Sequence, residues 1–329
     1  DLFIGPGGHG YSRENREAMY GWFNRATGRS ASRTEPELTL EDDQTLRCTP
    51  GGQVKSLGSK TVFDFTSQRA ARLASERKPL GADELVSQVR RLLKVPQLPA
   101  TAPTYRILRP FSIAARSTFQ ATPYAVQTEP GIHAVVYGIF SERHYSRPVG
   151  HGNPAALYVA GASAYEELRR DADNCFPVGV EHRYTCDVRG IGESRPDTCG
   201  GSSTYYTPYG NDYFYAAHGL MLGRSIVAQR TWDILRVAQF LRSVGHPQIH
   251  LTARGWGSIP ATLAALLDPS IVTVEMSEAP ESFTRIAQTP VYQWPLSSFI
   301  PGVLSIFDLP DCYRVLAETK QRFACQTES

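Results

Sequence analysis

The pattern of apolar and polar positions from residue 105 onward predicts an alternation of strands and helices. Short apolar runs rich in β-branched and aromatic residues predict strands, and apolar residues at helical spacing predict helices. The predicted strands cover residues 105–108, 112–119, 133–140, 155–160, 181–187, 249–252 and 271–276, and the predicted helices cover 164–172, 225–244, 259–267 and 311–317. This order indicates an α/β fold with a mostly parallel sheet and helices on both of its faces.

The N-terminal part of the chain has a different pattern. Residues 1–4 predict a short strand, and Ser12 is a suitable N-cap for a helix that carries Met19 and Trp22. The polar, acidic segment 28–48 is typical of a linker. Short strands are predicted at 53–54 and 61–65, and helices at 67–74 and 83–93. We therefore divide the chain into a terminal strand, loop and helix, a linker and a larger unit, at 1–27, 28–48 and 49–329.

Composition and charge narrow the classes of function. Hydrophobic residues make up 41% and charged residues 20% of the 329 residues, which excludes wholesale disorder. A formal charge of +2 gives no electrostatic reason to expect a nucleic acid as partner. The sequence contains no run of 18 uncharged apolar residues, so it predicts no membrane-spanning helix. The chain begins with neither Met nor a signal peptide, so we expect it to have been cut from a longer precursor.

The six cysteines do not suggest a metal site. None has C-x-x-C spacing or lies in a Cys/His cluster. Cys175 with Cys199, and Cys312 with Cys325, are candidate disulfide pairs, and the alternative is that most are reduced core residues. The compartment is left open, with a secreted or periplasmic location favoured, and no cofactor is expected.

The segment 249–267 carries the most specific chemical pattern of the chain. Between a predicted strand and a predicted helix stands Ala-Arg-Gly-Trp-Gly-Ser. A small-x-nucleophile-x-Gly pattern in this context is that of a nucleophile elbow, whose sharp turn exposes a catalytic hydroxyl. Here Gly255 stands at the nucleophile position, and Ser258 does not replace it, because the residues two before and two after it are not small. The alternative is an ordinary strand–turn–helix with glycines for close packing.

Two other segments fit the same interpretation. The pattern D-x-R-G-x-G-x-S at 187–194 follows a strand, and its Asp and Arg are expected to tie a loop down rather than to catalyse. The strand at 155–160 runs into small residues, so the backbone N–H groups of Ala162 or Ser163, together with that of Trp256, are candidate oxyanion-hole donors. A plain strand-to-helix turn is the alternative for this segment.

His9 is a candidate catalytic base. It lies in the glycine-rich sequence Gly-Gly-His-Gly-Tyr at 7–11, where a histidine is flexible and partly exposed. A single histidine on a loop is also a common surface residue, and that alternative stays open.

Taken together, these motifs resemble a known group of proteins. The loop with His9, the segment 16–24, the Asp187 loop, the Gly255 turn and the segment 307–311 resemble, in family order, the large α/β-hydrolases of the acetyl xylan esterase and dienelactone hydrolase type in which two hydrolase units are joined in tandem. The resemblance spans nearly the whole chain. It implies that residues 1–27 end a first unit, with its last strand, catalytic His loop and final helix, and that 49–329 is a second unit.

Two departures from this family affect the expected chemistry. The family nucleophile is serine, and the matching residue is Gly255. The segment 321–326 matches the acid-bearing strand, with Glu328 near the place of the acid, but no histidine follows it. The resemblance therefore implies an esterase-type fold whose local triad is broken.

Two functions follow as hypotheses. In the first, the chain is part of a carboxylic-ester hydrolase acting on a small-molecule or acylated carbohydrate ester, with His9 as the base and the missing serine upstream in the precursor. In the second, the larger unit is a non-catalytic pseudohydrolase that binds a ligand or supports the rest of the precursor. In both, the isolated chain lacks serine-hydrolase chemistry, and neither a nucleic acid nor a membrane is an expected partner.

Overall fold

The structure is a computed structural model that describes residues 2–30, 32–113, 119–195 and 212–327. The chain divides into two compact units, Asp1–Lys60 and Thr61–Ser329, which are described separately.

The first unit is built around α1 (Arg13–Thr27). Ser12 is its N-cap and accepts a hydrogen bond from the Asn15 amide, as the sequence predicts. The expected terminal strand is not found, because residues 2–5 lie outside any helix or strand and Leu2 and Ile4 are exposed. Residues of the expected linker pack back on the helix, where the Glu35 carboxylate accepts two hydrogen bonds from Arg16.

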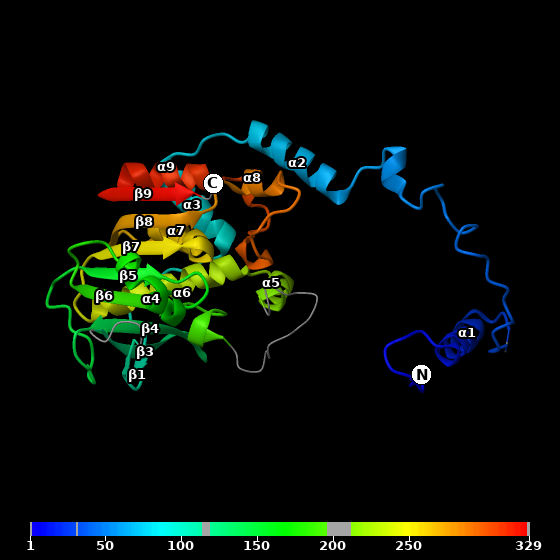
Figure 1. Cartoon of the computed structure of the whole chain (residues 1–329), viewed down its shortest axis with the longest axis horizontal. Helices are drawn as coiled ribbons and strands as arrows, with labels where there is room; N and C mark the ends of the chain where they lie inside the picture. The colour runs from blue at the N-terminus through cyan, green and yellow to red at the C-terminus, as the bar shows by residue number, and fades with distance from the viewer. Residues whose placement is uncertain (1, 31, 114–118, 196–211, 328–329) are drawn as a thin grey trace. The chain divides into compact units, whose positions relative to one another are not determined.

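The second unit contains one mixed sheet, shown in Figure 1. Its strands follow the order β1-β3-β4-β6-β5-β7-β8-β9, and β2 also pairs with β3. The first strands are antiparallel, whereas β6, β5, β7, β8 and β9 run parallel. The strands are β1 (Tyr105–Ile107), β2 (Phe111–Ser112), β3 (Gln120–Glu129), β4 (Ile132–Phe140), β5 (Ala155–Val159), β6 (His182–Asp187), β7 (Ile249–Arg254), β8 (Ile271–Ala279) and β9 (Arg322–Thr327).

Helices connect and cover these strands. The α-helices of this unit are α2 (Val62–Glu76), α3 (Ala82–Leu93), α4 (Ala164–Asp171), α5 (Asp212–Met221), α6 (Ile226–Ser243), α7 (Ser258–Leu267), α8 (Phe283–Ala287) and α9 (Leu309–Thr319). Every residue of α7 is buried, so this helix lies within the core next to α6 and α9.

The register of the strands shows that α4 and α7 cover opposite faces. Met276 of β8 contacts the Thr262 hydroxyl of α7. Its neighbour in the sequence, Glu275, lies in the same cross-strand row as Thr252 and Tyr158, and the Tyr158 hydroxyl reaches α4. Since successive residues of a strand point to opposite faces, the predicted fold with helices on both faces is confirmed.

Several further elements differ from the prediction. The predicted strand at 53–54 meets a 3₁₀ helix at Val54–Leu57. The alternating sequence at 61–65 predicts a strand, but Thr61 and Asp64 form a capping box that starts α2. The sequence predicts no strand at 120–129, where the structure has β3, and a proline is unusual inside a paired strand. Pro123 lies where the outer partner of β3 changes from β2 to β1, and its carbonyl still accepts a hydrogen bond from the Leu108 amide.

The candidate disulfides are not found among the described residues. Cys175, Cys312 and Cys325 all carry free thiols, and Cys199 lies outside the described residues. Cys175 and Cys312 are buried, so they fill core space as small apolar residues.

Candidate functional site

A sharp turn after the central strand β7 places Gly255 at the carboxyl edge of the sheet. Strand β7 ends at Arg254, a 3₁₀ turn covers Gly255–Gly257, and α7 begins at Ser258. Gly255 has a φ of 53°, in the left-handed region that favours glycine. A Cβ added there would meet no atom within 4 Å. Gly255 therefore lies in a positive-φ turn between a central strand and a helix, as the elbow interpretation requires, and a side chain at 255 would point into open space.

Two other glycines let the backbone close around this turn. A Cβ at Gly257 would lie 2.7 Å from the Val159 carbonyl oxygen, which is too close for any side chain. A Cβ at Gly161 would lie 2.9 Å from the Arg254 carbonyl oxygen and 3.5 Å from the Trp256 amide nitrogen. The loop after β5 therefore lies directly against the Gly255 turn, as an elbow and its oxyanion loop require.

Ser258 does not supply the missing hydroxyl. Ser258 is fully buried, and its hydroxyl donates a hydrogen bond to the Gly255 carbonyl oxygen at 2.7 Å. A hydroxyl that is held inside the first turn of a helix has no access to a substrate. The expectation that Ser258 is not a substitute nucleophile is consistent with this position.

The candidate oxyanion donors Ala162 and Ser163 already hold an anion. The amide nitrogens of Gly161, Ala162 and Ser163 lie 3.1, 2.8 and 3.2 Å from the same oxygen, Oε1 of Glu167. The other oxygen of this carboxylate accepts a hydrogen bond from the Tyr158 hydroxyl. Burial, together with the Glu167 charge, raises the pKa of Tyr158 well above its usual value, so that the phenol stays a donor. The loop is therefore arranged to bind a carboxylate, and its own chain supplies one.

Trp256, the other candidate donor, follows Gly255 within the 3₁₀ turn. Its side chain is half-buried and packs against the core. Its amide nitrogen lies on the side of the turn that faces Gly161. The structure thus places the Trp256 amide beside Gly161, the residue that precedes Ala162 and Ser163.

An ion pair stands at the same edge of the sheet. Arg254, the residue before Gly255, donates a hydrogen bond to Glu278 at the end of β8. This bond lowers the pKa of the Glu278 carboxyl. Glu278 has a φ of 52°, which is unusual for a residue other than glycine. Both side chains are partly exposed, so the pair is a feature of the rim rather than of the core.

The Asp187 loop has the structural role that the sequence predicts. The Asp187 carboxylate accepts hydrogen bonds from the backbone amides of Ala164 and Glu193, at 2.7 and 3.0 Å. Arg189 is bonded to the buried carboxylate of Asp233 in α6. Burial raises the pKa of Asp187 to about 6. These bonds fix the end of β6 to the start of α4, and so they hold the loop at 161–163 in place.

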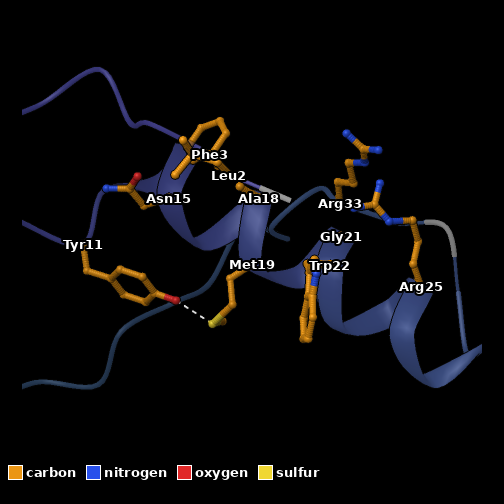
Figure 2. Close-up of a pocket in the computed structure, with 10 residues that line it drawn as sticks. All are labelled: Leu2, Phe3, Tyr11, Asn15, Ala18, Met19, Gly21, Trp22, Arg25 and Arg33. Carbon is orange, nitrogen blue, oxygen red and sulfur yellow. Dashed lines mark hydrogen bonds between the residues drawn. The ribbon is translucent and has the colours of Figure 1, made fainter.

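His9 belongs to the first unit and lies exposed in a bend. This unit has a hollow of about 520 Å³ beside α1, shown in Figure 2, and His9 is not among the residues that line it. On one side of the hollow the Tyr11 hydroxyl donates to the sulfur of Met19. Glu328, the candidate acid, lies outside the described residues.

The described residues contain no group of three or more His, Cys, Asp or Glu side chains placed to hold a metal ion. Among the described residues, no helix is long and apolar enough to cross a membrane.

Comparisons with known proteins place the fold. No family model and no curated protein matches the sequence. Among solved structures, an inferred acetyl xylan esterase from Bacteroides fragilis superposes with a TM-score of 0.53 at 13% identity, over 84% of this chain and 74% of the other. The fold is α/β-hydrolase-like. A glucuronoyl esterase from Solibacter usitatus matches at a TM-score of 0.43 and 12% identity, over 89% of this chain and 81% of the other.

Sequence reasoning missed Glu167 and Glu278. Two successive glutamates, Glu166 and Glu167, follow the N-cap Ser163, and an acidic first turn of a helix was the available signal. That signal does not tell which glutamate turns back onto the loop. In the structure Ser163 caps the Glu166 amide, while the Glu167 side chain reaches residues 161–163.

Proposed function

We propose that the chain is part of a carboxylic-ester hydrolase for acylated carbohydrate or small-molecule esters, and that its larger unit does not itself carry the nucleophile. The α/β-hydrolase-like fold supports the first statement, as does the name of the Bacteroides fragilis neighbour. One observation carries the second: Gly255 has the backbone conformation and open surroundings of an elbow nucleophile but no hydroxyl.

Ester hydrolysis on such a fold requires a hydroxyl, a base and oxyanion donors. The serine attacks the ester carbonyl, a base takes the serine proton, and backbone N–H groups stabilise the oxyanion. In the larger unit, position 255 has no hydroxyl, and two of the candidate donors, Ala162 and Ser163, hold Glu167. The serine is therefore proposed to lie upstream in a longer precursor, of which residues 1–27 contribute the loop and helix at the end of a first unit, with His9 as its base.

The alternative is that the larger unit is a non-catalytic pseudohydrolase that acts as a scaffold or a ligand-binding domain. The occupied amides of residues 161–163 favour it, because a unit that has kept its loop but filled it with its own carboxylate is suited to support or ligand binding. On this alternative the longer precursor also lacks esterase activity.

The test compares this chain with the longer precursor. We expect no hydrolysis of p-nitrophenyl acetate or acetylated xylan by the chain, and no labelling by a fluorophosphonate probe. The precursor is expected to hydrolyse both esters and to be labelled at a serine outside this chain. An inactive, unlabelled precursor establishes the alternative, and a labelled serine within residues 61–329 overturns both.

A further inference from the structure

We propose that Glu167 is an internal ligand of the amides of residues 161–163, which keeps them closed to an outside carboxylate or oxyanion. The inference rests on the proposed function only in that these amides are the candidate oxyanion donors. It identifies the residue that closes them and the chemistry that would enter when it is removed.

The arrangement of the bonds supports a carboxylate rather than a neutral ligand. Three consecutive amides converge on Oε1 of Glu167, and the Gly161 amide also lies 3.3 Å from Oε2. Hydrogen bonds to an ionised acceptor are roughly twice as strong as those between neutral groups. The Tyr158 hydroxyl, from a buried residue of β5, donates to the same carboxylate. The loop and its strand therefore present four donors to one anion.

The loop that holds this carboxylate borders the Gly255 turn. Gly161 approaches the Gly255 turn so closely that its Cβ would lie 2.9 Å from the Arg254 carbonyl oxygen. The carboxylate therefore occupies the amides of a loop that borders the Gly255 turn. Two of the candidate oxyanion donors of this loop, Ala162 and Ser163, are already bonded to it.

An internal carboxylate also has an advantage over a free one. Glu167 is on α4, which begins directly after the loop, so its effective concentration at these amides is on the order of millimolar or more. Acetate in solution must compete with this tethered group. Removing the side chain of Glu167 is expected to leave the amides open to acetate, which is also the acid product of an acetyl ester.

The experiment titrates the full, isotope-labelled chain with sodium acetate and follows the amides of residues 161–163 by NMR. In the unaltered chain we expect no saturable shift. In Glu167→Ala we expect saturable shifts of these amides, with an apparent affinity at least about tenfold higher than in the unaltered chain. The matched control is Glu166→Ala, because Glu166 is in the same turn of α4 but pairs with Arg169 at the surface. Sodium chloride at equal ionic strength separates binding from salt effects.

Each outcome bears on the proposal. Saturable binding of acetate in Glu167→Ala alone supports it. Equal binding by the unaltered chain overturns it, as does a folded Glu167→Ala chain that binds no acetate. If Glu167→Ala fails to fold, Glu167→Gln tests the same point, because a neutral side chain holds the amides more weakly than a carboxylate does. Saturable acetate binding by Glu167→Gln and not by the unaltered chain supports the proposal, and its absence overturns it. The measurement needs no ester hydrolysis, so its failure is distinct from that of the proposed function.

Discussion

The carboxylate of Asp233 holds Arg189 by its side chain and by its backbone at the same time. Asp233 accepts hydrogen bonds from the Arg189 amide at 3.0 Å, from Nε at 2.8 Å and from Nη2 at 2.5 Å. Asp233 is fully buried in α6, whereas Arg189 lies in the loop after β6. One carboxylate thus fixes this loop to the helix layer.

Removal of that carboxylate is expected to destabilise the unit strongly. Asp233→Ala leaves a buried guanidinium without its main partner, so we expect the free energy of unfolding to fall by about 3–5 kcal/mol. Glu129→Ala is the matched control, because Glu129 also bonds Arg189 but is partly exposed. Its loss should be about 1 kcal/mol. Urea unfolding of both variants measures the difference, and a larger loss in Glu129→Ala would contradict the assignment.

The glycines of the turn should respond differently to a methyl group. Gly257→Ala places Cβ against backbone carbonyl oxygens of residues 159 and 160, which cannot move away, so we expect a loss of about 2–3 kcal/mol. Gly255→Ala meets open space and bears only the strain of its positive φ, about 1 kcal/mol. Gly255→Asn should lose less, because Asn tolerates this conformation better. Unfolding midpoints in urea give the order, and equal losses at 255 and 257 would exclude the close approach at 257.

The buried carboxyl of Asp187 predicts a defined pH dependence. Its pKa is about 6 in the folded chain, because burial outweighs the hydrogen bonds from Ala164, Glu193 and Tyr137. The unfolded value is about 4, so the folded state binds the proton more tightly. The stability that Asp187 contributes is therefore complete below pH 4 and is lost as the pH rises through 6, in all about 3 kcal/mol.

The carboxyl ¹³C signal of Asp187 measures this directly. We expect a titration midpoint near pH 6 in the native chain, with the signal identified by its loss in Asp187→Asn. A midpoint at pH 4 or below would show that hydrogen bonding, and not burial, dominates at this carboxyl.

The cysteines should separate into reactive and protected thiols. Burial raises the pKa of Cys175 to about 12 and places those of Cys186 and Cys312 well above the usual value, so these three are expected to stay unreactive in the native chain. Cys48 is exposed and should react at once. Ellman's reagent with peptide mapping measures each site, and denatured chain serves as the control. Recovery of a linked Cys312–Cys325 peptide would contradict the free thiols.

The sequence predicts the central part of the fold because local and tertiary signals agree there. Strands β5, β7 and β8 are apolar runs bounded by turn residues, and the structure pairs them in parallel. The prediction fails where the same local sequence pattern is compatible with two different secondary structures. Residues 61–65 alternate like a strand, but the capping box of Thr61 and Asp64 favours a helix. In β3, Pro123 is tolerated because the strand that pairs with the outer edge of β3 changes there from β2 to β1. This pairing is a tertiary contact that the local sequence does not show.

At the candidate site, the sequence predicts the residues that the backbone turn and the Asp187 loop require. It does not predict which side chain occupies the amides of residues 161–163. The glycine at 255 and the tie-down role of Asp187 follow from residue type and spacing, and the structure agrees with both. That Glu167 fills the amides of residues 161–163 depends on the direction of α4 relative to the loop. The sequence does not show this direction, because Glu166 and Glu167 are adjacent residues of the same type and either could face the loop.

The open, left-handed turn at Gly255 has a consequence for how this unit can change over generations. A serine at a φ of 53° would carry strain of about 1–2 kcal/mol, whereas glycine adopts the same conformation freely. On the proposed function, glycine at this position spares the unit the strain that a serine nucleophile would bring. The substitution Gly255→Ser is expected to lower stability and, with Glu167 still on the loop, to bring no activity by itself. Activity would therefore need at least two simultaneous changes, the first of which costs stability with no gain in function.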